Sequence, residues 1–154
     1  MNLISLDTST TSTGYAVFVD CKLQSYGVIE PTIKDSSDER IKSMCLNLLD
    51  LLHSTKPDII VIEKLNVNRN MVTTRNLSKV IGVAYGYAIT NDVFYYEIQA
   101  SEWRSTLSIK GKGRKELKEL SKKYIKTQFD IHTECDDLSD AICAGQAYIL
   151  KFSD

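Results

Sequence analysis

Apolar residues recur along the chain at two spacings, one typical of β-strands and one typical of α-helices. Five short apolar runs predict strands, at residues 3–6, 15–19, 22–29, 58–63 and 93–97. The run at 58–63 is apolar on both faces, which favours a central, parallel strand covered by helices. Only the Asp20-Cys21 turn separates the second run from the third, so these two strands are predicted to form a hairpin.

Helical spacing begins after the third predicted strand. From Ile41 to Leu52, apolar residues recur every three or four positions and predict an amphipathic helix. Ser36 lies three residues before Glu39, the spacing of a capping box, and Pro57 ends the helical pattern. Further helices are predicted at 75–90, 100–107, 114–128 and 137–151, with a polar linker at 66–74.

The order of these elements predicts an α/β fold in which a mixed five-stranded sheet is flanked by helices. With 154 residues, 43% of them hydrophobic, the chain is expected to form a single domain over residues 1–154. No apolar stretch approaches the roughly 20 residues that cross a bilayer, and the N-terminal run lacks the pattern of a signal peptide. The four cysteines include no C-x-x-C pair, so reduced cysteines in a cytoplasmic protein are expected.

The net charge of −1 hides a basic segment. Residues 104–126 contain nine basic and two acidic side chains, a local charge of +7 against −8 in the rest of the chain. This asymmetry favours a polyanionic partner on one face. A solvated helix face explains the lysines at 118–126 equally well, whereas the glycine-spaced loop at 110–115 combines charge with flexible backbone.

Four acidic residues border apolar runs and are the main candidates for chemistry. Asp7 and Glu63 each end a predicted strand. Asp137 and Asp140 open the last predicted helix, three residues apart, so they share a face. A carboxylate at the end of a buried strand is costly unless a cation meets it, and Lys64 would point to the opposite face. A shared divalent cation is the simplest neutraliser, and oxygen ligands without neighbouring His or Cys favour Mg²⁺ or Mn²⁺.

The ordered set of these motifs resembles the ribonuclease H-like superfamily and, within it, the RuvC family of Holliday junction resolvases. The opening Leu6-Asp7-Thr-Ser-Thr-Thr-Ser-Thr-Gly14 is similar to the family's first-strand motif. Ile60-Val-Ile-Glu63 is similar to its acidic fourth strand, and Asp137-Leu-Ser-Asp140-Ala resembles its C-terminal D-x-x-D-A motif. The resemblance covers nearly the whole chain and implies a ribonuclease H-like fold.

The resemblance also implies two-metal phosphodiester hydrolysis that leaves 5′-phosphate and 3′-hydroxyl ends. Asp7 would bridge two Mg²⁺ ions, for which Mn²⁺ would substitute. Glu63 and Asp140 would hold individual ions, and Asp137 would complete the shell. Adjacent Asp136 could exchange roles with Asp137, and Asp137 could also serve only as a helix cap.

The implied substrate is a four-way DNA junction, with other branched DNA as further candidates. Two symmetric nicks need two active sites, so a C₂ homodimer follows. Gly82 and Gly86 permit close approach of another helix, either across this dimer or within the chain.

Phosphates along the DNA arms would be neutralised by basic residues, namely Lys64, Arg69, Arg75, Arg104, Lys110, Lys112, Arg114, Lys115 and Lys118. The short, lysine- and asparagine-rich chain also resembles RuvC-like proteins of phages and Gram-positive bacteria, which implies the cytoplasm of a bacterial host cell.

One departure from the family and two alternative functions remain. Residues 64–70 contain no aromatic residue, whereas the familiar bacterial enzymes carry one after the catalytic Glu to open the junction by stacking. Ribonuclease H is an alternative within the fold, supported by Glu39 near the start of the first helix. A one-lobed actin-like ATPase module is the second alternative, because residues 7–14 match its phosphate loop. Trp103 is interpreted as a packing residue.

Overall fold

A computed structural model describes residues 1–32, 36–65 and 70–152. The strands are β1 (Asn2–Thr8), β2 (Thr13–Val19), β3 (Lys22–Ile29), β4 (Ile59–Glu63) and β5 (Phe94–Ile98). The helices are α1 (Ser37–Thr55), α2 (Met71–Thr90), α3 (Ala100–Thr106), α4 (Arg114–Phe129) and α5 (Asp136–Phe152). None of the helices in these described ranges combines the length and apolar character needed to cross a membrane.

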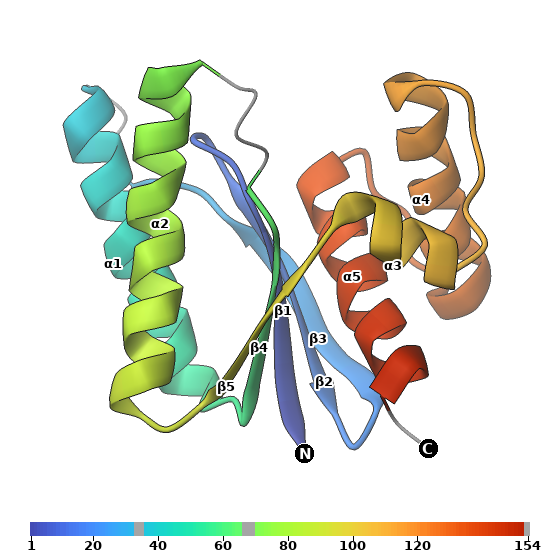
Figure 1. Cartoon of the computed structure of the whole chain (residues 1–154), viewed down its shortest axis with the longest axis horizontal. Helices are drawn as coiled ribbons and strands as arrows, with labels where there is room; N and C mark the ends of the chain where they lie inside the picture. Colours follow the sequence, from blue (N-terminus) through green and yellow to red (C-terminus); the bar gives the residue numbers. More distant parts are fainter. Residues whose placement is uncertain (33–35, 66–69, 153–154) are drawn as a thin grey trace.

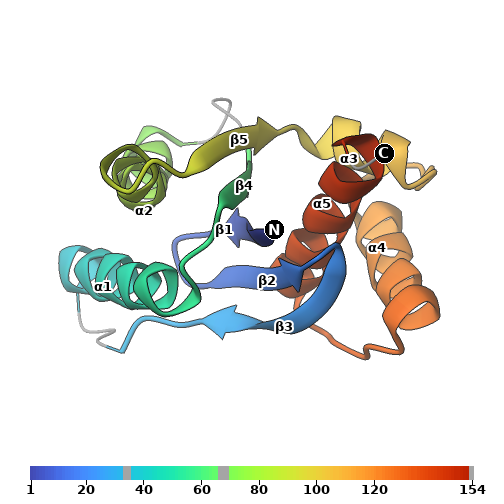
Figure 2. The ribbon, with the colours of Figure 1, turned by 90° about the horizontal axis from the view of Figure 1, so that it is seen from below.

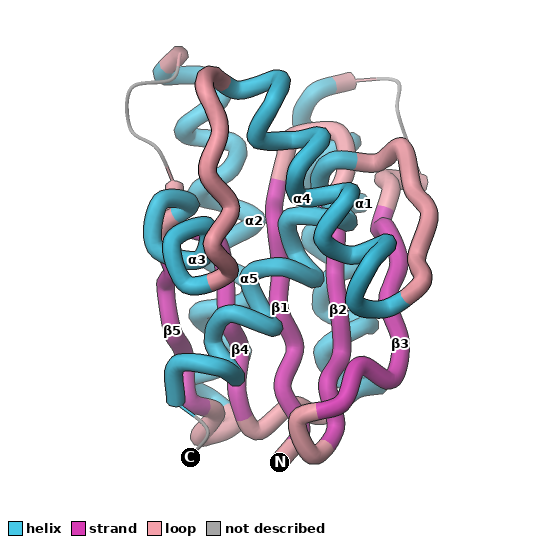
Figure 3. The backbone as a smooth tube through the Cα atoms, turned by 90° about the vertical axis from the view of Figure 1, so that its right-hand side faces the viewer, coloured by secondary structure: helices cyan, strands magenta, loops and turns pink. Residues whose placement is uncertain are grey.

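The strands form one mixed sheet in the order β3-β2-β1-β4-β5. β1 lies at the centre, antiparallel to β2 and parallel to β4, and β4 is parallel to β5. α1 and α2 make the crossovers that parallel strands require. Figure 3 shows the sheet face on, behind α4 and α5. The predicted α/β fold with a mixed five-stranded sheet is confirmed.

The sheet separates two helical layers. α1 and α2 cover one face, and α3, α4 and α5 cover the other (Figures 1 and 2). Alternate residues of β1 enter different cores, because successive side chains of a strand point to opposite faces. Leu3 packs with the helices of the α5 layer, whereas Ile4 and Leu6 pack with α1 and α2.

α5 lies unusually close to the sheet. The Ser5 hydroxyl on β1 donates a hydrogen bond of 2.7 Å to the carbonyl of Ala141 on α5. A Cβ on Gly145 would lie 2.4 Å from the Phe18 ring, and a Cβ on Gly14 would lie 2.0 Å from the Asp137 carbonyl oxygen. Glycine at these two positions therefore permits the close packing of α5 on β1 and β2.

The start of α1 agrees with the sequence-based prediction, whereas the start of α2 does not. The Ser36 side chain accepts a hydrogen bond from the Glu39 backbone N–H, so the predicted cap of α1 is confirmed. The prediction of a linker through Thr74 is wrong, because α2 already begins at Met71, with Asn70 accepting a hydrogen bond from Val72 N–H as its cap. Residues 66–69 of that predicted linker lie outside the described residues.

Candidate metal and nucleic-acid site

Asp7 and Glu63 come together because of the β1–β4 register. Leu3 pairs with Ile59 and Leu6 pairs with Ile62, and the same offset continued by one residue sets Asp7 beside Glu63. Both residues follow the strand alternation onto the sheet face that α5 covers, the face that Leu3 and Val61 also occupy. The two parallel strands thus present their terminal carboxylates at one edge of the sheet.

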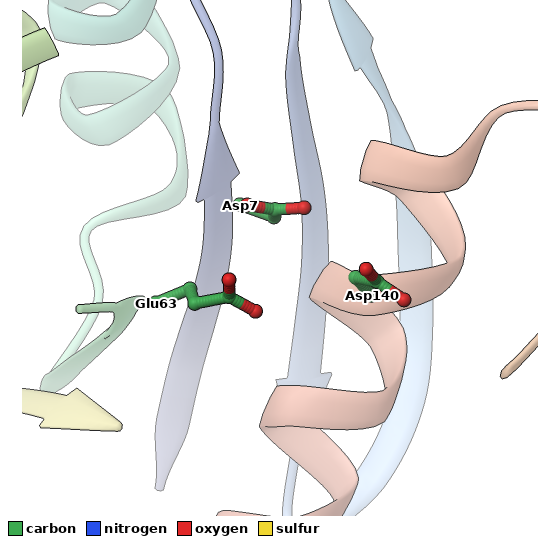
Figure 4. A group of neighbouring side chains, drawn as sticks. All are labelled: Asp7, Glu63 and Asp140. Atoms are coloured by element: carbon green, nitrogen blue, oxygen red, sulfur yellow. The ribbon is translucent and has the colours of Figure 1, made fainter. Parts of the chain in front are cut away.

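Asp140 completes a group of three carboxylates. It lies in the second turn of α5, 7% exposed. One oxygen each from Asp7, Glu63 and Asp140 can be chosen so that all three lie within 4.8 Å of one another. Figure 4 shows the three side chains converging from β1, β4 and α5. Three acids separated by up to 133 positions in the sequence are therefore gathered by strand pairing and by the close docking of α5.

Asp137 and Asp136 lie at the rim of this group. The Ser12 hydroxyl, in the turn between β1 and β2, donates a hydrogen bond to the Asp137 carboxylate. Asp136 is paired with Lys118 and, at 3.2 Å, with Lys122, both on α4. Both acids line the same pocket as the three clustered carboxylates, and neither belongs to the cluster. Their neighbours favour Asp137 over Asp136 as a further ligand, because two lysines already compensate the charge of Asp136.

Helix α3 contacts two of the three clustered carboxylates. The Trp103 indole N–H donates a hydrogen bond of 2.9 Å to Glu63 Oε2. The neighbouring Arg104 guanidinium lies 3.9 Å from Asp140 Oδ2 and 4.6 Å from the centre of the Trp103 ring. The sequence predicts Trp103 as a packing residue and does not reveal its contact with Glu63. The Trp-Arg pair next to a basic loop was the available signal, but no spacing rule links it to a residue 40 positions away.

The electrostatics of Asp140 fit a cation site. Burial, and then the nearby charge of Glu63, raise the pKa of Asp140 from 3.8 to about 6, while Ser121 and then Arg104 act in the opposite direction. Within the part of the chain that the structure describes, Asp140 Oδ1 is buried and accepts no hydrogen bond. A buried carboxylate oxygen without a donor, beside two further carboxylates, fits a hard divalent cation such as Mg²⁺ or Mn²⁺. Asp7, Glu63 and Asp140 are therefore the residues that could hold such an ion.

An open pocket of about 720 Å³ surrounds the carboxylates. Four of the predicted DNA-binding residues line it: Lys64, Arg104, Arg114 and Lys118. Lys110, Lys112 and Lys115 are exposed on the loop before α4 and on its first turn, outside the pocket. Arg75 is exposed on α2, in the other helical layer, and Arg69 lies outside the described residues. The pocket is thus lined by both acidic and basic side chains. The acids could bind cations, and the basic residues could bind the phosphates of a nucleic-acid backbone.

Glu39, which supported the ribonuclease H alternative, is exposed at the start of α1. α1 covers the opposite face of the sheet from the clustered carboxylates (Figure 1). The first helix therefore adds no acid to the cluster, and the alternative loses its structural support.

Comparison with known proteins gives one consistent result. The family model described as "Crossover junction endodeoxyribonuclease RuvC" matches residues 3–146. A protein of that name from Chlamydia caviae is 27% identical over 145 residues, covering 90% of this chain and 86% of the relative. Another from Alkaliphilus metalliredigens is 27% identical over 151 residues, covering 94% and 90%.

Two solved structures share the fold. RuvC of T. thermophilus, in complex with a Holliday junction substrate, superposes with a TM-score of 0.75 at 15% identity, covering 97% of this chain and 94% of that one. The Fowlpox virus resolvase, in complex with Holliday junction DNA, superposes with a TM-score of 0.72 at 16% identity, and the match covers both chains fully.

Proposed function

The chain belongs to the family of crossover junction endodeoxyribonucleases RuvC, and from this membership we infer that it is a Holliday junction resolvase that nicks four-way DNA by metal-dependent hydrolysis. The observation that supports the assignment most strongly is the convergence of Asp7, Glu63 and Asp140 in a pocket walled by basic residues. The family match and the site geometry both favour this chemistry.

The carboxylates divide the work of holding ions. Asp7, on the central strand, would bridge two Mg²⁺ ions, with Glu63 and Asp140 each holding one. Asp137 completes the shell in this proposal, oriented by the Ser12 hydroxyl. When bound, the two ions would activate the attacking water and stabilise the leaving 3′ oxygen. Ends with 5′-phosphate and 3′-hydroxyl groups follow from that chemistry.

The basic residues hold the DNA. Lys64, Arg104, Arg114 and Lys118 surround the carboxylates and would bind the phosphates on either side of the scissile bond. Lys110, Lys112 and Lys115 extend this positive surface along the loop before α4 and would contact a DNA arm, and Arg75 would contact DNA from α2. Arg69, outside the described residues, stays a predicted DNA contact. Such contacts position DNA without reading its sequence, so they suit recognition of a branched shape. Other branched DNA is proposed as a further substrate class.

A second copy of the chain is proposed to bind the open face of α2, defined here by Ser78, Gly82, Tyr85 and Ile89. These residues are exposed and recur at spacings of four, three and four along the helix. Among the described residues, nothing lies within 4 Å of a Cβ built on Gly82 or Gly86. Packing within the chain therefore does not account for these glycines, whereas a helix of a second copy could approach there closely. The resulting C₂ dimer would match the two-fold symmetry of a four-way junction.

The experiment that tests the function is cleavage of labelled four-way, three-way and linear DNA and of an RNA–DNA hybrid, with Mg²⁺ or Mn²⁺. Asp7→Asn removes one ligand charge at nearly constant size, so we expect junction binding to persist while paired nicks disappear. Asp92→Asn, an exposed acid in the turn after α2, is the matched control and should cleave like the wild type. Cleavage of the hybrid in preference to the junction would instead move the assignment to ribonuclease H.

Action in the cytoplasm of a bacterial host cell, with the gene carried by the bacterium or by a phage, stays a prediction of the sequence.

A further inference from the structure

Trp103 is the chain's only tryptophan, and its side chain is fully buried. It belongs to the core formed by the α5 layer. Its indole N–H, however, does not bond to a backbone carbonyl of that core. It donates to Glu63 Oε2 over 2.9 Å, at the edge of the core where the carboxylate cluster begins.

Packing alone does not explain this hydrogen bond. Leu, Ile or Phe would fill an apolar site without a polar atom to satisfy, whereas a buried indole must find an acceptor. An N–H bonded to an ionised carboxylate is shorter and about twice as strong as one bonded to a neutral group. A hydrogen bond to Oε2 restricts the rotation of the Glu63 carboxylate relative to Asp7 and Asp140.

Helix α3 is itself anchored, which makes it a firm support for this contact. The Tyr96 hydroxyl on β5 donates to Glu102 Oε1 over 2.8 Å, and Lys151 near the end of α5 donates to the same oxygen over 2.6 Å. Glu102 precedes Trp103, so the helix is tied to both the sheet and α5 at the turn that carries the indole. Arg104, stacked on the ring, reaches Asp140 from the same turn.

We propose that Trp103 is a positioning residue for the ion site, whose indole N–H fixes the Glu63 carboxylate in the orientation that binds a divalent cation. The proposal rests on the metal-dependent function inferred above, and it assigns to α3 a role in preparing the site before DNA arrives. The same contact makes the emission of Trp103 a built-in reporter of ion binding at Glu63.

The direct test measures ion binding by the whole chain without DNA. Mn²⁺ is titrated into the wild type, Trp103→Phe and Ile125→Ala, and free Mn²⁺ is followed by electron paramagnetic resonance. Loss of an outer hydrogen bond to a metal ligand typically weakens affinity about 10- to 100-fold, and we expect a change of this size for Trp103→Phe. Ile125 is fully buried in the same core on α4, so Ile125→Ala controls for loosened packing and should retain the wild-type affinity.

Cleavage kinetics provide a second, independent readout. If the indole acts only by orienting Glu63, the Mg²⁺ concentration that gives half-maximal cleavage should rise in Trp103→Phe by a similar factor. The kcat at saturating Mg²⁺ should return close to the wild-type value, because the ligands themselves are intact. A general packing defect would lower kcat at every Mg²⁺ concentration instead.

Tryptophan emission tests the contact in the unaltered protein. We expect the Trp103 fluorescence emission of the wild type to change saturably as Mg²⁺ is added. This change should be absent in Glu63→Gln. Replacement of Trp103 by benzothienylalanine, a tryptophan isostere with sulfur in place of the N–H, keeps the shape of the side chain and serves if Trp103→Phe fails to fold. This isostere should show the same weakened Mn²⁺ binding.

Wild-type Mn²⁺ affinity in Trp103→Phe or in the isostere would overturn the positioning role and leave the nuclease assignment intact. A wild-type chain that binds no Mn²⁺ and cuts no DNA would overturn both.

Discussion

Asp140 is a carboxylate of the proposed ion site whose pKa is raised. Its burial and the nearby charge of Glu63 raise its pKa to about 6, so a proton must leave before the residue can bind an ion. In the metal-free protein, the contribution of Asp140 to stability is fully present below its usual pKa of 3.8 and is lost as pH rises through about 6. A bound cation reverses this preference because it requires the ionised form.

The affinity for Mn²⁺ should therefore depend on pH. Below pH 6 we expect the dissociation constant to rise about tenfold for each unit of acidification, and above it to level off, as for release of one proton. Calorimetric titration with Mn²⁺ from about pH 5 to about pH 8 measures this dependence. An affinity that stays constant across this range would show that Asp140 is already ionised in the metal-free protein.

Single residues also mark the limit of what the sequence predicted. Asp7, Glu63 and Asp140 could be found because each borders an apolar run, and a charge in that place needs a partner. Their assignment as ion ligands, like that of Asp137, stays a prediction. The Trp103–Glu63 hydrogen bond could not be found, since it depends on where α3 lies against the end of β4. Nothing in the local sequence of either element encodes that placement.

Among the elements, the packing of α5 against β1 and β2 determines most directly where the carboxylates of α5 lie. Gly14 pairs with Asp7 across the hairpin and lies against the backbone of Asp137. A methyl group at this position has no space, because backbone rather than a flexible side chain lies 2.0 Å away. The start of α5, which carries Asp137 and Asp140, is thus positioned by a residue without a side chain.

Gly14→Ala should push the start of α5 away from the sheet. Overpacking of this kind costs about 1–3 kcal/mol, and we expect a loss of that size in the free energy of unfolding in urea. Mn²⁺ binding should weaken as well, because Asp140 would move relative to Asp7. Ser25→Ala, at an exposed position of β3, is the control, since it lies away from both the carboxylates and α2. Equal stability of the two variants would contradict the close packing described here.

Elements were predicted from the sequence with uneven success. The bounds predicted for β3, residues 22–29, agree with the structure, because the Asp20-Cys21 turn marks where the strand begins. The start of α2 was missed by four residues. Its first turn is rich in Thr and exposed, so it lacks the apolar periodicity on which helix prediction relies, and only Asn70 signals the beginning.

At the scale of the whole molecule, the open face of α2 is the surface that suits a second copy. Gly82→Glu tests it sharply. A Cβ at this position meets no described atom within 4 Å, and glutamate favours a helix more than glycine does, so the fold should be retained. We expect the variant to become monomeric in light scattering, and paired cleavage of junctions to fall.

Leu150→Glu, an exposed position on α5 in the opposite layer, is the control for added charge and should keep the wild-type mass. A Gly82→Glu protein that remains dimeric would show that association uses another surface.

The sheet separates the clustered carboxylates, on its α5 face, from the α2 surface proposed to bind a second copy, which belongs to the other layer. A chain with a substitution at Asp7 would therefore keep the whole open face of α2. In a cell that makes both forms, inactive chains would recruit active ones, and each mixed pair would cut one strand and leave the junction joined by the other. Such a defect would be dominant. The altered chains would inhibit the normal ones, and junctions nicked in one strand only would accumulate.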